Sequence, residues 1–82
     1  MKTIYKYELP THQRIVLPEN YVVLSVGMQR DTTYLWCLVD PASNKKEVQF
    51  SIYGTGWDMP NDPGKYIGTY FDGSFVWHVF EK

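Results

Sequence analysis

The chain has 82 residues, 44% of them hydrophobic and 17% aromatic, with a formal net charge of −1 and a single cysteine, Cys37. This length allows one domain, predicted to span residues 1–82, and the small charge excludes the strong positive field that general nucleic-acid or anionic-membrane binding needs. One cysteine excludes an internal disulfide, and no apolar run approaches the roughly 20 residues of a membrane helix. We therefore expect a soluble protein of a reducing cytoplasm.

Short runs of alternating apolar and polar residues, separated by Pro, Gly, Asn and Asp, follow one another along the sequence. Period two is typical of strands, and no run has the longer period of an amphipathic helix. The predicted strands cover, in chain order, residues 3–9, 14–17, 21–29, 33–39, 47–53, 66–71 and 74–81. The sequence therefore predicts an all-β fold, a small antiparallel sandwich or barrel of about seven short strands.

Two details of the first three predicted strands depend on single residues. His12 lies between the first and second strands, where we expect an exposed loop. Gly27 lies inside the third strand and is predicted to mark a β-bulge, because it has no side chain to pack. One face of the third strand is predicted to hold Val22, Leu24, Val26 and Met28.

The fourth predicted strand, residues 33–39, is apolar on both faces. One face holds Tyr34, Trp36 and Leu38, and the other holds Leu35, Cys37 and Val39. A strand buried on both sides is predicted to be central in its sheet. Cys37 is therefore interpreted as a core cysteine and not a nucleophile, which would need partial exposure and a cationic or histidine neighbour.

The last two predicted strands form a C-terminal hairpin. An Asp-Gly pair between alternating runs favours a two-residue turn, here at Asp72-Gly73. In that register Tyr70 faces Phe75 and Gly68 faces Trp77. The face predicted to join the core holds Tyr66, Tyr70, Phe75, Trp77 and Val79.

The opposite face of this hairpin also includes Ile67 and Thr69 and is too apolar to remain in water. Part of it is expected to close against the rest of the chain. The remainder is predicted to form an interface with a partner or a second copy of the chain, at Val76, His78 and Phe80.

Residues that could carry chemistry are few and scattered. His12 and His78 lack the Cys/His spacing of a metal site, and His78 on a strand is interpreted as structural. Asp58 and Asp62 are interpreted as turn formers, because an oxygen cage for calcium needs more ligands than two aspartates. No Ser/His/Asp order, phosphate loop or zinc-protease motif occurs, so we expect no enzymatic activity, no metal and no cofactor.

The loop from Gly54 to Lys65 has the composition of a ligand site. Closely spaced glycines can turn backbone N–H groups into an anion-binding nest, and here an aromatic ring and a cation follow nearby. A nucleotide would fit such a site, predicted at Gly54, Thr55, Gly56, Trp57 and Lys65. The alternative is that the glycines only let the chain leave a strand tightly.

Five segments of the chain form a distinctive combination: Leu-Ser-Val-Gly-Met-Gln (24–29), Leu-Trp-Cys-Leu-Val-Asp-Pro (35–41), Tyr-Gly-Thr-Gly (53–56), Tyr-Ile-Gly-Thr (66–69) and Phe-Val-Trp-His-Val-Phe-Glu (75–81). Together they resemble a family of short, functionally uncharacterised proteins encoded by tailed bacteriophages. This sequence has Trp57 where that family commonly has a histidine, so a ligand role of that histidine does not carry over. The resemblance implies a phage origin and expression in the cytoplasm of a bacterial host.

The resemblance implies no particular activity, but small phage accessory proteins commonly bind and block a host component. We therefore expect a non-enzymatic inhibitor of a host protein, such as an anti-CRISPR or other counter-defence protein. One alternative is a sponge that captures a nucleotide signal in the loop from Gly54 to Lys65. Another, single-stranded nucleic-acid binding, is disfavoured because seven tyrosines and three tryptophans could stack bases but no basic groove accompanies them.

Overall fold

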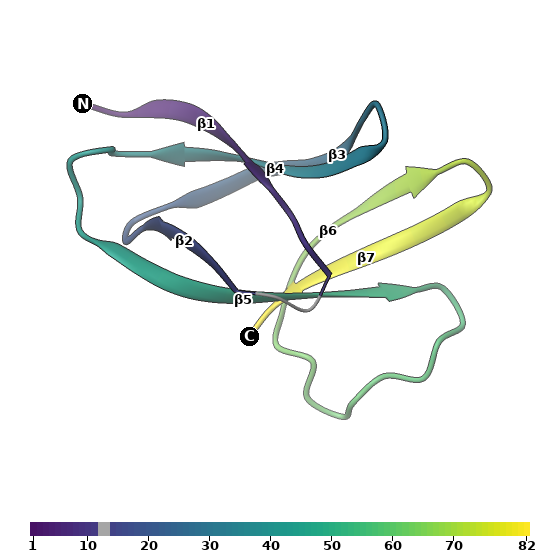
Figure 1. Ribbon diagram of the computed structural model, residues 1–82. Helices are drawn as coiled ribbons and strands as arrows, with labels where there is room; N and C mark the ends of the chain where they lie inside the picture. The colour runs from purple at the N-terminus through teal and green to yellow at the C-terminus, as the bar shows by residue number, and fades with distance from the viewer. Residues whose placement is uncertain (12–13) are drawn as a thin grey trace.

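The computed structural model describes residues 1–11 and 14–82, which form seven strands and no helix (Figure 1). The strands are β1 (Thr3–Glu8), β2 (Arg14–Pro18), β3 (Val22–Gln29), β4 (Thr32–Val39), β5 (Lys45–Gly54), β6 (Lys65–Asp72) and β7 (Phe75–Glu81). The all-β prediction is confirmed. The expected loop position of His12 lies outside the described residues.

The strands form two antiparallel sheets that pack against each other. In the three-stranded sheet β4 lies between β1 and β3, as predicted for a strand that is apolar on both faces. The four-stranded sheet has the order β2-β5-β7-β6. It depends on β5, because this strand extends along the full length of the sheet (Figure 1). Residues 45–49 of β5 pair with β2, and residues 50–54 pair with β7.

The core lies between the inward faces of β4 and β5. Period-two alternation places every second residue of these strands there. The buried apolar side chains are Leu9, Leu17, Leu35, Cys37, Val39, Val48, Phe50, Ile52, Tyr70 and Val79. The core position predicted for Cys37 is confirmed, because none of its surface is exposed.

A β-bulge interrupts β3 between Val23 and Ser25, and the predicted bulge at Gly27 is wrong. A bulge inserts one extra residue, so the alternation of inward and outward side chains shifts at that point. The predicted common face of β3 is therefore also wrong. Val26 and Met28 pack on the core, whereas Val22 and Leu24 are half exposed on the outside.

β6 and β7 form a hairpin, but the predicted Asp72-Gly73 turn is wrong, because Asp72 pairs with Phe75. The turn residues are Gly73 and Ser74. Gly73 has a φ of 59°, and a type II′ turn needs a positive φ only at its first central residue. A type I′ turn at Asp72-Gly73 would instead force Asp72 into a left-handed conformation.

A second β-bulge, between Tyr66 and Gly68, changes which hairpin side chains face the core. It turns Tyr66 outward, while Ile67, the extra residue, packs against the core. The predicted core face is thus only partly correct. Tyr70, Trp77 and Val79 face the core, whereas Tyr66 and Phe75 are exposed.

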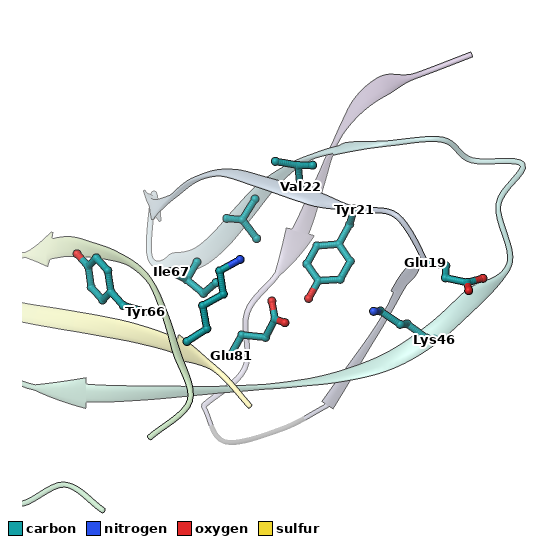
Figure 2. A pocket seen from close by; sticks show the side chains of 9 residues that line it. Glu19, Tyr21, Val22, Lys46, Tyr66, Ile67 and Glu81 are labelled. Carbon is teal, nitrogen blue, oxygen red and sulfur yellow. The ribbon is translucent and has the colours of Figure 1, made fainter. Parts of the chain in front are cut away.

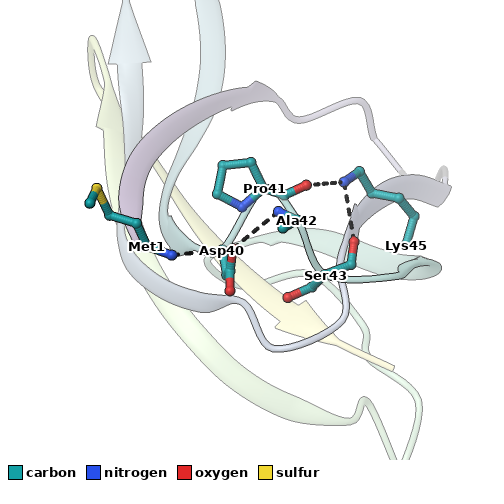
Figure 3. A network of polar contacts seen from close by, with 6 residues as sticks. All are labelled: Met1, Asp40, Pro41, Ala42, Ser43 and Lys45. Atoms are coloured by element: carbon teal, nitrogen blue, oxygen red, sulfur yellow. Dashed lines mark hydrogen bonds and ion pairs between the residues drawn. The ribbon is translucent and has the colours of Figure 1, made fainter.

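The connection between β4 and β5 is held by its own polar contacts (Figure 3). Asp40 Oδ1 accepts a hydrogen bond from the Ala42 N–H at 3.1 Å, which is an Asx turn. Lys45 Nζ donates to the Pro41 carbonyl oxygen at 3.1 Å. These contacts lie immediately before β5 and hold the connection that leads into it.

The turn assignment leads to a stability prediction. Gly73→Ala is expected to lower the free energy of unfolding by about 1–2 kcal/mol, because a Cβ disfavours the positive φ at this position. Ser74→Ala should change it by less than about 0.5 kcal/mol. Urea denaturation of the two variants measures the difference, and equal losses would contradict the Gly73-Ser74 turn.

Candidate functional site

The outward side of β5, β7 and β6 carries the residues that the sequence assigned to an interface. Val76, His78 and Phe80 project from β7 on this side and are half-buried. We call its apolar side chains the aromatic face. The aromatic face consists of Tyr53, Tyr66, Phe71, Val76 and Phe80.

Phe80 holds the aromatic face together. Its ring centroid lies 5.9 Å from that of Tyr53 and 5.6 Å from that of Tyr66, and both pairs meet edge to face. Aromatic pairs with this geometry stabilise each other beyond the area they bury. The margin of the face remains in water, since Phe71 is 70% exposed and Tyr66 is 55% exposed.

A chain of polar side chains crosses the same side of the sheet. His78 Nε2 lies 2.8 Å from Thr55 Oγ1, and His78 Nδ1 lies 3.1 Å from Thr69 Oγ1. Thr69 Oγ1 is in turn 2.6 Å from the Tyr66 hydroxyl. Both imidazole nitrogens are therefore engaged, and the ring is fixed in the plane of the network.

The chemistry of this network depends on what orients the imidazole. An activated hydroxyl nucleophile needs a histidine base whose second nitrogen is held by a third group, which is a carboxylate in the Ser-His-Asp arrangement. The second nitrogen of His78 meets the Thr69 hydroxyl, and no carboxylate in residues 1–11 and 14–82 bonds to this ring. A hydroxyl does not stabilise an imidazolium as a carboxylate does. The network is suited to holding side chains in place.

Four of the five predicted ligand-site residues form one turn at the end of β5. The Trp57 N–H donates to the Gly54 carbonyl oxygen at 3.1 Å, and the Thr55 N–H donates to the Val76 carbonyl oxygen at 3.1 Å. Gly56 has a φ of 87°, which a type II turn requires at its third residue. Two of the N–H groups that an anion-binding nest would use are therefore already bonded within the protein.

Gly54 also provides the space in which the Trp57 indole lies. A Cβ at Gly54 would be 2.7 Å from Trp57 Nε1. From this position the Trp57 ring meets Trp77 of β7 edge to face, with centroids 5.3 Å apart. The turn therefore docks its one aromatic side chain onto the end of the four-stranded sheet.

Lys65, the fifth predicted site residue, lies elsewhere. It pairs with Glu81 in the hairpin and lines a cavity of about 350 Å³ between the two sheets, shown in Figure 2. No residue that lines this cavity also lines the cavities beside Trp57. The structure brings Gly54, Thr55, Gly56 and Trp57 together but does not bring Lys65 to them.

The cavity in Figure 2 carries charges of both signs and satisfies part of them internally. The Tyr21 hydroxyl points toward Glu81, and burial together with a hydrogen bond to this carboxylate raises the pKa of Tyr21. Lys46 Nζ lies 5.4 Å from the centroid of the Tyr21 ring. The mixture of Glu19, Glu81 and lysines gives no net positive site for an anion.

Cys37 has the character of a structural residue. Burial raises the pKa of its thiol to about 11, so the thiol stays protonated at neutral pH. A buried, protonated thiol is a poor nucleophile. The described part of the chain holds no group of three or more potential metal ligands, and it includes no helix with the length and apolar character to cross a membrane.

Sequence reasoning placed Thr69 on the same face as His78 but missed their direct pairing, and it did not assign Tyr53 or Tyr66 to this face. Tyr53 reaches His78 through pairing of β5 with β7, which the long loop separates in sequence. Thr69 lies directly opposite His78 only in the observed hairpin register. The signal that could have identified Thr69 is Gly73 as the first residue of a type II′ turn.

The whole chain matches a family model. This model, described as "Domain of unknown function (DUF7352)", matches residues 1–82. No curated protein and no solved structure matches the chain. The match takes in both sheets, the aromatic face and the turn that holds Trp57.

Burial of Cys37 predicts its reactivity. In the native protein at about pH 8 the thiol is expected to react with dithionitrobenzoate at least about a hundredfold more slowly than after unfolding, because it is protonated and inaccessible. Absorbance of the released thiolate measures both rates. Similar rates before and after unfolding in guanidinium chloride would contradict the core position.

The contact between Gly54 and Trp57 predicts a non-additive pair of substitutions. Gly54→Ala is expected to lower the free energy of unfolding by about 1–3 kcal/mol, because the new Cβ displaces the indole. In a Trp57→Ala background the same substitution should cost clearly less, since the ring is gone. A double-mutant cycle by urea denaturation measures this, and additive losses would contradict the contact.

Proposed function

The chain belongs to the DUF7352 family along its whole length, and we propose that it acts by binding a partner protein through the aromatic face. The observation that carries this proposal is a set of outward aromatic side chains from three strands, next to a fixed polar network. Such a surface offers tyrosine and phenylalanine rings to a partner without charged groups among them. Binding of this kind requires no catalytic residue.

The composition of the aromatic face supports this proposal. The cores of protein interfaces are enriched in aromatic side chains and depleted of charged ones, and their strongest contacts often involve tyrosine. Among the described residues, the outward positions of the paired part of β5, β6 and β7 hold no Lys, Arg, Asp or Glu: they are Ser51, Tyr53, Tyr66, Thr69, Phe71, Val76, His78 and Phe80. Thr55, Thr69 and His78 bond among themselves and so hold the neighbouring side chains of this side of the sheet in place.

Preorganisation is the second support. Tyr66 is held twice, by the ring of Phe80 and by the hydroxyl of Thr69. Ser51, which pairs with Phe80 on this side of the sheet, is only 5% exposed. The aromatic rings therefore cover the backbone at this position. Side chains already fixed in one conformation lose little entropy when a partner binds.

For the biological role, we propose a phage accessory protein that blocks a host component in the bacterial cytoplasm, with counter-defence as the leading possibility. The support is the sequence resemblance to short phage-encoded proteins. A blocking protein needs a stable surface and no active site, and the aromatic face meets that need. No observation favours nucleotide capture, because Lys65 is remote from Trp57.

Phe71→Lys provides a sharp test, because Phe71 is 70% exposed and its replacement should leave the fold intact. Tagged wild-type protein is expected to retain a bacterial protein from a lysate at near-stoichiometric yield. Phe71→Lys should reduce that yield by about tenfold or more, since it places an ammonium against an apolar partner surface. Quantitative mass spectrometry of the eluates measures the yields.

Val22→Lys is the matched control, because Val22 is 50% exposed on the three-stranded sheet. It should retain the partner at the wild-type yield. Light scattering of the isolated protein tests whether the partner is a second copy of the chain. A wild-type dimer that Phe71→Lys dissociates would show that it is. Equal capture by wild type and Phe71→Lys would contradict a role of the aromatic face.

A further inference from the structure

A second surface feature lies on the core side of the hairpin. It is a cavity of about 210 Å³ between the Trp57 turn and the β6–β7 hairpin. Its lining residues are Thr11, Ile52, Trp57, Tyr70, Asp72 and Trp77. Three of these six are aromatic and one is a carboxylate, and no lysine or arginine is present.

Two of the rings form a corner of the cavity. Trp57 and Trp77 pack edge to face, with centroids 5.3 Å apart and an angle of 88° between the ring planes. Tyr70 lies directly opposite Trp77 in the β6–β7 ladder and adds a third ring. Phe75 stacks on Trp77, with an angle of 27° between the rings, and supports this indole from a neighbouring cavity.

The walls are built into the fold. Ile52 and Tyr70 are 4% and 6% exposed, so the base of the cavity is part of the core. Trp57 is held over Gly54, where a Cβ would collide with the indole, and its N–H bonds to the Gly54 carbonyl oxygen. The cavity therefore exists before any ligand enters.

The electrostatics of the cavity favour a cation. The face of an aromatic ring carries negative partial charge, and tryptophan attracts cations most strongly. Asp72 adds a full negative charge at the rim, and within residues 1–11 and 14–82 no ammonium or guanidinium group forms an ion pair with it. Aromatic rings together with a carboxylate are the groups from which aromatic cages for organic cations are built.

We propose that the cavity bounded by Trp57, Trp77, Tyr70 and Asp72 binds a compact organic cation, either a methylated ammonium or a guanidinium group. The rings solvate the charge and the methyl or NH₂ groups, and the carboxylate orients it. The sign of charge is opposite to that of the nucleotide expected from the glycine loop, because the loop places Trp57 beside Asp72 and away from Lys65. The proposal is independent of the aromatic face, which lies on the other side of the sheet.

The experiment is an NMR titration of the three tryptophan indole N–H signals with tetramethylammonium chloride and, separately, with N-acetylarginine amide. Saturable shifts are expected at Trp57 and Trp77 and none at Trp36. Tighter binding of tetramethylammonium indicates a free quaternary ammonium compound as the natural ligand. Tighter binding of the arginine derivative indicates a side chain of a partner protein.

Asp72→Asn should weaken binding of the better probe by about fivefold or more, because it removes the charge at constant size. Asp31→Asn, in the exposed turn between β3 and β4, is the matched control and should bind as wild type. Trp57→Leu should abolish the Trp77 shift. Equal shifts with neutral tert-butanol, unchanged affinity of Asp72→Asn, or no saturable shift with either cation would overturn the proposal.

Discussion

Burial of Phe50 between the two sheets is the interaction on which the rest of this structure depends. Phe50 is fully buried and lies on β5 where pairing passes from β2 to β7. A chain of this size has few large core side chains, so the inward direction of this one ring fixes the alternation of the whole strand. Tyr53 is outward for that reason, and it is the residue that β5 contributes to the aromatic face.

The two β-bulges reconcile this core with a sequence that has more apolar residues than the core can hold. In β3 the bulge keeps Val26 on the core and leaves Val22 outside. In β6 the bulge sends Ile67 inward and Tyr66 outward. An extra residue changes the facing of the strand at the point where it is inserted. The second bulge thereby supplies the tyrosine that links the aromatic rings to the His78 network.

The hairpin and the Trp57 turn together produce two surfaces of different chemistry. The outward side has aromatic rings and hydroxyl groups without charge, and the core side has a ring-lined cavity with the carboxylate of Asp72. Val76 belongs to the aromatic face and also lines the neighbouring cavity beside Trp57, so the two surfaces adjoin at the end of the sheet. The β6–β7 hairpin contributes residues to both surfaces.

The sequence by itself determined the strands, the central position of β4 and the burial of Cys37, because period-two alternation reports directly on two-sided and one-sided burial. It also identified Val76, His78 and Phe80 as an outward set. Tertiary structure decided what the alternation cannot express: the two bulges, the one-residue shift of the hairpin turn, and the pairing of β5 with β7 across a long loop. The pairing of β5 with β7 depends on contacts between residues distant in sequence, whereas the hairpin turn depends on the positive φ of Gly73. Those contacts separated Lys65 from Trp57 and placed Asp72 beside it, and for this reason the ligand that we propose is a cation and not the anion expected from the sequence.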